Sequence, residues 1–217
     1  SNTHNQLVPF NHELDGGFNE FGKRLLKLIE KQWNAEAILK EDPIVAIEYS
    51  DRYLKNPLSL LLLLNICFSM KQLSTREAGI KKITVHTSSS KGVFYRGESR
   101  QIWEDWQDIE DQKYVYKLMF GSVSNEFEMK VDENNRSISH GRFLKLSHQS
   151  GKSTLIAFDQ GMGYWNRCFF KQKSFLRYFP FDQAVQKQAA HLIEIINNDF
   201  DIHTDYNWSS YVVVQYV

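Results

Sequence analysis

Apolar and polar positions along this chain follow two periods, one typical of helices and one typical of strands. Across residues 17–40, apolar side chains recur every three or four positions with Lys and Glu opposite them, which predicts an amphipathic helix. Short apolar segments at 44–49 and 82–87 predict two strands, and the leucine-rich segment 58–68 between them predicts a buried helix. A strand, a helix and a strand in this order predict a βαβ unit with a parallel pair of strands.

The rest of the pattern adds strands and helices to this unit. We expect strands at 127–131, 143–146, 153–158 and 211–214, and helices within 99–119 and 183–200. The fold class that follows is α/β, with a mixed β-sheet flanked by helices on both faces. Because no repeat or Pro-rich linker divides the chain, we expect one domain over 17–217, preceded by a tag remnant or flexible lead-in over 1–16.

Composition limits the classes of function. The chain has 217 residues, 42% of them hydrophobic, which supports one domain with a substantial core. Lys+Arg and Asp+Glu both number 26, which argues against a globally basic nucleic-acid binder and leaves room for a local basic surface. Cys67 and Cys168 have no metal-ligand spacing, so we expect no metal, no cofactor, a cytoplasmic location and, at Cys67, a buried inert thiol.

The segment Ser139-His140-Gly141-Arg142 carries the clearest sign of chemistry. Residues two apart on a strand face the same side, so His140 and Arg142 are placed to meet one phosphate. An imidazole can attack or transfer a proton, and a guanidinium holds phosphate oxygens, as phosphodiester chemistry requires. An incidental pair of polar residues on a solvated strand explains the same segment.

Two other segments fall where ligands collect in α/β folds. Asp51, Arg52 and Tyr53 follow the strand at 44–49, and the carboxyl ends of parallel strands are the usual binding edge. Asp159 and Gly161 begin a glycine-containing turn, which permits close approach of the backbone to a ligand. The plainer interpretation is a capping acid beside a surface arginine, and a turn held by core aromatic residues.

Basic and aromatic residues are interleaved between residues 167 and 178. Lys171 and Lys173 belong to this stretch, and such a surface binds nucleic-acid strands or an anionic membrane. The alternative is a core-packing segment with a solvated basic side.

The order of these motifs resembles that of the phospholipase D-like domain at the C-terminus of MIT-domain proteins. The resemblance is clearest over 17–166. It implies a phospholipase D-like fold in which His140 is nucleophile or acid/base and no metal is needed. It also implies that Arg142 and Arg52 hold the phosphate, while Asp51 or Asp159 orients the imidazole.

The motifs depart from the wider superfamily pattern His-x-Lys-x-x-x-x-Asp. Arg142 replaces the lysine, Ser147 stands where the acid would fall, and there is one histidine motif where the superfamily needs two. The resemblance therefore implies a degenerate site, and a complete site would require a homodimer.

Together these observations lead to a functional expectation. We expect a degenerate phospholipase D-like module that recognises phosphodiester groups of nucleic acid within a larger intracellular protein, with bacterial defence or nucleic-acid handling as the setting that the resemblance implies. If it is an enzyme, it would be a metal-independent phosphodiesterase or nuclease. The alternative is a non-catalytic module that binds an acidic phospholipid head group or a protein, or that oligomerises.

Overall fold

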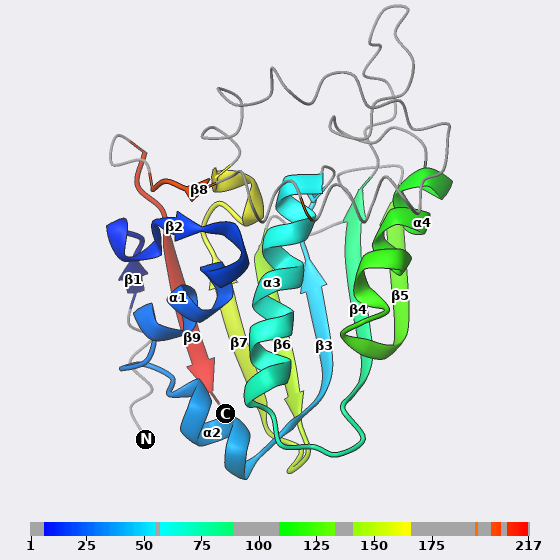
Figure 1. Cartoon of the computed structure of the whole chain (residues 1–217), viewed down its shortest axis with the longest axis horizontal. Helices are drawn as coiled ribbons and strands as arrows, with labels where there is room; N and C mark the ends of the chain where they lie inside the picture. The colour runs from blue at the N-terminus through cyan, green and yellow to red at the C-terminus, as the bar shows by residue number, and fades with distance from the viewer. Residues whose placement is uncertain are drawn as a thin grey trace, which may run out of the picture.

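The apolar segments of the chain assemble into a seven-stranded mixed sheet with helices packed against it (Figure 1). The computed structural model describes residues 7–54, 57–88, 109–132, 141–165, 194, 201–204 and 208–216. The sheet has the strand order β1-β9-β7-β6-β3-β4-β5, and β2 pairs with β8 separately. The strands are β1 (Leu7–Pro9), β2 (Gly16–Gly17), β3 (Ile44–Ser50), β4 (Ile80–Ser88), β5 (Ser124–Asp132), β6 (Arg142–His148), β7 (Ser153–Phe158), β8 (Asp201–Ile202) and β9 (Tyr211–Tyr216). The helices are α1 (Phe21–Leu28), α2 (Ala35–Glu41), α3 (Pro57–Leu73) and α4 (Ile109–Phe120), with short 3-10 helices η1 (His12–Leu14), η2 (Phe18–Glu20) and η4 (Met162–Trp165).

The sheet has a parallel half and an antiparallel half. Strands β3, β4 and β5 are parallel, whereas β6, β7, β9 and β1 pair antiparallel with their neighbours. Helix α3 connects β3 to β4, and α4 precedes β5, so both crossovers step across the sheet in one direction. Because such crossovers are right-handed, both helices lie on the same face. The predicted α/β class, the mixed sheet and the βαβ unit are confirmed.

The described helices cover one face of the sheet, where the sequence predicted helices on both. Helices α1 and α2 contact α3 and lie on its side of the sheet (Figure 1). The helix expected at 183–200 lies outside the described residues, apart from the helical residue Glu194. On the opposite face, one row of side chains changes from apolar to polar across the sheet: Leu7, Val213, Ala157, Phe143, Ser50, His86 and Lys130.

Helix α3 is apolar almost all round because it is enclosed by α1, α2, α4 and the sheet. Its buried residues include Leu60, Leu62, Leu63 and Ile66, each with no exposed surface. The buried helix that the sequence predicted is thus confirmed. Burial also raises the pKa of the Cys67 thiol to about 12, which makes this cysteine unreactive in the folded chain, as expected.

A small number of polar contacts fix α3 against its neighbours. The side chain of Asn65 accepts a hydrogen bond from the Gly22 N–H at 2.6 Å and donates to the Asn19 carbonyl at 2.8 Å. A Cβ at Gly22 would meet the Asn65 carbonyl oxygen at 2.6 Å, so glycine allows α1 to cross α3 closely. On the other side, Lys71 Nζ donates to the Ser122 carbonyl at 2.8 Å.

Residues 17–40 form η2, α1 and α2 instead of the single helix that their spacing predicted. The interruption falls between Leu28 and Ala35, where Asn34 caps α2 by accepting a hydrogen bond from the Ala37 N–H at 3.1 Å. Ile29 and Trp33 lie in this turn and are almost fully buried. The apolar spacing therefore continues through a turn, which periodicity alone does not distinguish from a helix.

The first residues described by the structure belong to the sheet. Leu7 to Pro9 form β1, which pairs antiparallel with Tyr211 to Val213 of β9. Leu14 of η1 is fully buried, and Asn11 caps that turn by accepting a hydrogen bond from the Glu13 N–H. This part of the expected lead-in is consequently integrated into the core, whereas residues 1–6 lie outside the described residues.

Candidate functional site

The loop that follows β3 is held in place by side chains that bind one of its backbone carbonyl groups. The Leu54 carbonyl accepts hydrogen bonds from Thr87 Oγ1 at 3.2 Å, Gln112 Nε2 at 3.2 Å and the Tyr116 hydroxyl at 2.5 Å. These donors come from the end of β4 and from α4, so two elements distant in sequence hold one peptide group. The loop therefore presents its side chains from a fixed backbone.

Asp51 is the buried centre of this edge, with 1% of its surface exposed. Its Oδ2 accepts a hydrogen bond from the Tyr49 hydroxyl at 2.8 Å, and its Oδ1 accepts one from the Tyr53 N–H at 2.8 Å. The Arg142 Nε lies 3.8 Å from the same Oδ1, which makes an ion pair between β3 and β6. Asp51 accordingly holds Tyr53 and Arg142 in place from a buried position.

Burial dominates the electrostatics of this group. Removal from water raises the pKa of Asp51, while the hydrogen bonds from Tyr53 and Tyr49 and the charge of Arg142 act in the opposite direction. Burial and the neighbouring carboxyl also raise the pKa of the Tyr49 hydroxyl well above its usual value. The hydroxyl therefore stays protonated and remains a donor to Asp51.

Arg142 spans the distance from this buried carboxyl to the surface, and its side chain is 20% exposed. Its Nη1 donates to the Asp159 carbonyl at 2.6 Å, and its Cζ lies 5.4 Å from the centre of the Tyr53 ring, within range of a cation–π contact. Among the described residues, Nη2 has no hydrogen-bond partner. Within the part of the chain that the structure describes, this nitrogen therefore has no acceptor, and the guanidinium lies beside Tyr53, a residue that is 46% exposed.

Gly161 is required where the turn after β7 meets this pair. Its φ of +67° is a backbone conformation that favours glycine. A Cβ there would lie 2.5 Å from Asp51 Oδ2 and 2.6 Å from Arg142 Cδ. The backbone of this turn thus lies directly against the Asp51–Arg142 pair, whereas its approach to a ligand remains a prediction.

The structure brings together residues from all three predicted segments. Asp51 and Tyr53, Arg142, and Asp159 and Gly161 converge at the carboxyl ends of β3 and β7 and the start of β6. The ligand-binding roles that we assigned to them remain predictions.

The other predicted site residues contribute less to this geometry. Arg52 contributes its carbonyl, which accepts a hydrogen bond from Ser88 Oγ at 2.7 Å. His140, Lys171 and Lys173 lie outside the described residues. The predicted catalytic pair is therefore described only at Arg142.

Sequence reasoning missed Tyr49, the donor to Asp51. The signal was present, because residues two apart on a strand face the same side, and Tyr49 precedes Asp51 by two. Met162, whose backbone also hydrogen-bonds at this site, gives no such signal, since its position depends on the fold of the turn.

A second polar cluster closes the opposite end of β3. Asp42 Oδ1 accepts a hydrogen bond from the Ser150 N–H at 2.9 Å, and the Ser150 hydroxyl donates to Oδ2. The buried His148 ring contacts the Asp42 carbonyl through Nδ1 at 2.9 Å and Thr154 Oγ1 through Nε2 at 2.7 Å. These contacts tie the predicted hairpin of β6 and β7 to the start of β3.

On the open face, His86 Nε2 lies 2.7 Å from Asp132 Oδ2, and both side chains are partly exposed. Within the described residues, no group of three or more His, Cys, Asp or Glu side chains is placed to hold a metal ion. The helices described here also include none with the length and apolar character needed to cross a membrane.

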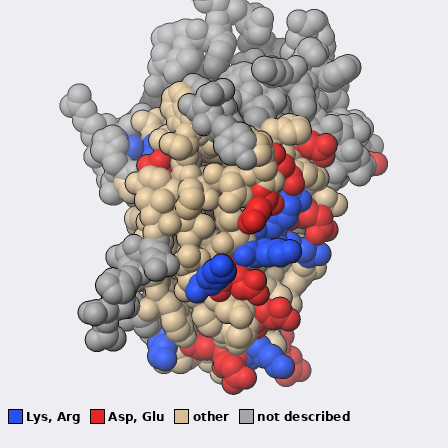
Figure 2. Space-filling view, turned by 90° about the vertical axis from the view of Figure 1, so that its left-hand side faces the viewer, with Lys and Arg blue, Asp and Glu red and all other residues tan. Residues whose placement is uncertain are grey.

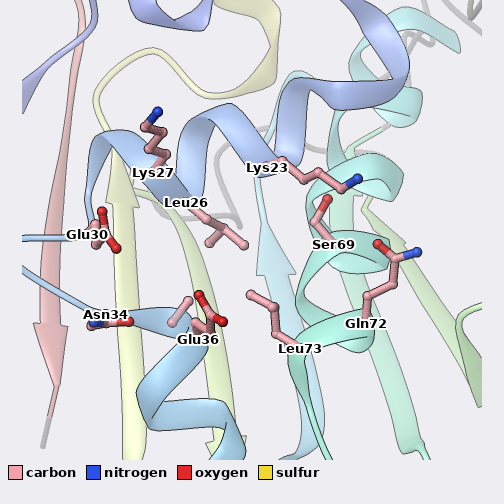
Figure 3. A pocket seen from close by; sticks show the side chains of 10 residues that line it. Lys23, Leu26, Lys27, Glu30, Asn34, Glu36, Ser69, Gln72 and Leu73 are labelled. Carbon is pink, nitrogen blue, oxygen red and sulfur yellow. The ribbon is translucent and has the colours of Figure 1, made fainter.

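A pocket of about 350 Å³ opens between α1, α2 and α3 (Figure 3), and neither Asp51 nor Arg142 lines it. Leu26 and Leu73 form part of its lining, with Lys23 and Lys27 from α1 and Glu36 from α2 around them. Cations and anions are mixed in this lining, so it selects no single ligand charge. None of the predicted site residues belongs to it.

The fold and the site define an α/β domain with a mixed sheet, in which β3 ends at a buried aspartate that pairs with an arginine at the start of β6. Residues 4–216 match the family described as DEAD/DEAH box helicase YjiV, C-terminal domain, and the chain belongs to this family. No curated protein matches the chain. A C-terminal domain of a helicase implies further domains in the parent protein, as the sequence led us to expect.

This match corrects the phospholipase D-like resemblance, which was wrong. The helicase-domain family covers almost the whole chain, whereas the resemblance depended on short motifs with gaps between them. Acids, glycines and arginines at strand ends recur in α/β folds because tight turns and ligand edges need them. Asp51 and Arg142 also pair with each other, so this structural contact accounts for an acid and an arginine at these two positions.

Proposed function

We propose that this domain serves a helicase as an accessory module that contacts the sugar-phosphate backbone of a single nucleic-acid strand. The observation that carries the proposal is the Arg142 guanidinium, held between Asp51 and the Asp159 carbonyl with Nη2 unpartnered among the described residues. A guanidinium positioned in this way is suited to a phosphate oxygen. Membership of a helicase-domain family supports nucleic acid as the source of that phosphate.

Tyr53 supplies the second half of the contact. Tyr53 is 46% exposed, its ring lies beside Arg142, and its backbone is fixed through Asp51. Aromatic rings next to cations bind single strands because every base has a π-face to stack on and a phosphate nearby. The pair thus favours a strand of any sequence over one particular base.

We expect the binding to be weak and local. The net charge of the chain is zero, and Figure 2 shows cations and anions interspersed on the side of the molecule that it presents. For a contact to one or two phosphates of a single strand, the logarithm of the binding constant should fall with the logarithm of the salt concentration, with a slope of about −0.7 for each phosphate. In the parent protein, such a contact would add to those of the other domains.

Fluorescence anisotropy with a labelled single-stranded oligonucleotide at low salt tests the proposal. Replacing Tyr53 by Ala should weaken binding by about tenfold, since base stacking on an aromatic ring contributes about 1–3 kcal/mol. Tyr114→Ala is a matched control, because that ring on α4 is 43% exposed and makes no described contact with Arg142.

Two results would contradict the proposal. One is the absence of binding by the unaltered domain at low salt. The other is an equal loss in Tyr53→Ala and Tyr114→Ala, which would place binding away from the Asp51–Arg142 edge. Thermal unfolding of both variants shows whether either substitution acts through stability instead.

The remaining functional expectations involve residues outside the described part of the chain. Metal-independent phosphodiester cleavage depends on His140, and equal activity of the wild type and His140→Ala would exclude it. Binding to acidic phospholipid depends on Lys171 and Lys173, and flotation with anionic liposomes tests it. No described contact supports either, so the nucleic-acid contact is the function that the geometry favours.

A further inference from the structure

Strand β5 is the last strand of the sheet among the described residues. It has nine residues, Ser124 to Asp132, and no described strand pairs with its outer side. Its pairing with β4 is parallel without a register shift, and its sequence contains no Pro or Gly. Such an edge presents regularly spaced backbone N–H and C=O groups to another strand.

The edge is also held in a fixed position. The Phe127 ring stacks on Phe120 of α4 with 4.9 Å between centroids and an interplanar angle of 4°. Phe127 also lies near Tyr116, at 6.4 Å between ring centroids. Because α4 fixes the strand before any partner arrives, pairing would cost little ordering of the backbone.

The sequence of β5 is complementary to itself when two copies run antiparallel about Glu128. In that register, Glu126 faces Lys130 of the second copy and Phe127 faces its Met129, and each pair occurs twice. Glu126 and Lys130 are exposed, and Phe127 and Met129 are half-buried. Opposite charges and apolar side chains directly across an antiparallel pair stabilise it.

The centre of this arrangement places Glu128 opposite its own copy. Within one chain, Glu128 Oε2 lies 2.6 Å from the Nζ of Lys82 on β4, and this contact lowers the pKa of the Glu128 carboxyl. Two lysines, one from each copy, therefore lie beside the two central carboxylates. The repulsion between the two Glu128 carboxylates is therefore reduced by the Lys82 side chain of each copy.

We propose that this edge is a homodimer interface, in which β5 pairs antiparallel with β5 of a second copy about a two-fold axis at Glu128. The two seven-stranded sheets then continue into each other. The surface is isologous, as a closed two-fold dimer requires. The same charges would act as protection against edge pairing if the chain were monomeric, and the experiments separate these outcomes.

Charge reversal measured by analytical ultracentrifugation of the whole chain tests the pairing. Glu126→Lys and Lys130→Glu each place like charges opposite each other at both outer positions, and each should raise the dimer dissociation constant by about tenfold or more. The double variant restores both pairs and should return the constant to within about threefold of the wild type. A wild-type chain that stays monomeric at every concentration, or a double variant as weak as the singles, overturns the proposal.

Disulfide trapping tests the register independently. In a Cys168→Ser background, Glu128→Cys places two thiols across the two-fold axis, where facing Cα atoms are about 4.5–5.5 Å apart and a disulfide forms readily. The buried Cys67 does not interfere, and Glu126→Cys is the matched control because its partner is Lys130. We expect rapid cross-linking of Glu128→Cys alone, and of a mixture of Glu126→Cys with Lys130→Cys. Equal cross-linking of Glu128→Cys and Glu126→Cys overturns the register.

Discussion

Strand β3 has an aspartate at each end, and each connects the strand to the hairpin of β6 and β7. Asp42 precedes the strand and holds Ser150 in the turn of that hairpin. Asp51 follows the strand and meets Arg142 at the start of β6. Asp42 remains partly exposed, whereas Asp51 is buried and has an arginine as its charged partner.

The difference shows how the environment of a carboxyl group determines its role. At Asp42, some burial raises the pKa, but two hydrogen bonds from Ser150 and the nearby charges of His148 and Lys152 outweigh it, so the pKa is lowered. At Asp51, burial is the larger effect and the pKa is raised despite similar bonds. Asp42 therefore links β3 to the hairpin turn through hydrogen bonds, whereas Asp51 is a buried carboxyl group that pairs with a partly exposed arginine.

Removing each carboxyl group should give the largest contrast. Asp51→Ala leaves the Arg142 guanidinium largely buried without its partner, and we expect the free energy of unfolding to fall by about 3–4 kcal/mol. Asp42→Ala removes two hydrogen bonds at a partly solvated site and should cost about 1 kcal/mol. Urea denaturation of both variants measures the difference. Equal losses would contradict the contrast between a buried ion pair and partly solvated hydrogen bonds.

Replacing the glycine near each aspartate should likewise cost more stability at the Asp51 end of β3 than at the Asp42 end. Gly161→Ala forces a Cβ against Asp51 and Arg142 and strains a positive φ, so we expect a loss of about 3 kcal/mol. Gly151→Ala in the hairpin turn has a φ of +90° and no atom within 4 Å of the added Cβ, so only the backbone strain of about 1 kcal/mol applies.

The excess loss in Gly161→Ala then measures the steric part of the effect. Similar losses in the two alanine variants would show that the Asp51–Arg142 pair moves aside for a methyl group.

The smallest effect should be a pH dependence of opposite sign at the two ends. Asp42 has a lowered pKa in the folded chain, so its contribution is present above its unfolded value of about 3.8 and is lost as the pH falls through the folded pKa. Asp51 has a raised pKa, so its contribution is present below that value and is lost as the pH rises through the folded pKa.

The free energy of unfolding of the wild type should therefore be compared across pH with that of a neutral variant at each aspartate. The stability advantage over Asp42→Ala should shrink below about pH 4, by under about 1 kcal/mol because the group is near solvent. Relative to Asp51→Asn, the wild type should lose stability as the pH rises. Curves that move in the same direction for both residues would contradict the assignment.

The sequence predicted the parts of the fold that depend on local periodicity. The length and leucine content of the segment 58–68 favoured a buried helix, and the shorter runs around Ile47 and Val85 favoured strands, so the parallel pair followed. The break after Leu28 was missed because Ile29 and Trp33 keep the apolar spacing through a turn. The position of β1 was missed because its partner, β9, lies at the other end of the chain.

The candidate site was predictable only as a set of segments. The sequence placed the residues after β3 and β7 where ligands collect in α/β folds, but the direction of each side chain depends on register. Tyr49 pairs with Leu144 between β3 and β6, and this register turns Asp51 and Arg142 toward the helices. Motif order did not contain that information, and it therefore favoured the wrong family.

Helix α3 has a consequence for how this sequence specifies one structure. A helix that is apolar almost all round is driven into the interior, but its apolar surface does not favour one rotation about its axis. Asn65 and Lys71 supply that choice through their contacts with α1 and with the loop before β5. Exchanges among the leucines of α3 should therefore be tolerated, whereas Asn65→Leu would leave the helix inside with several competing orientations. Two polar side chains thus specify the rotation of the helix, while the leucines specify its burial.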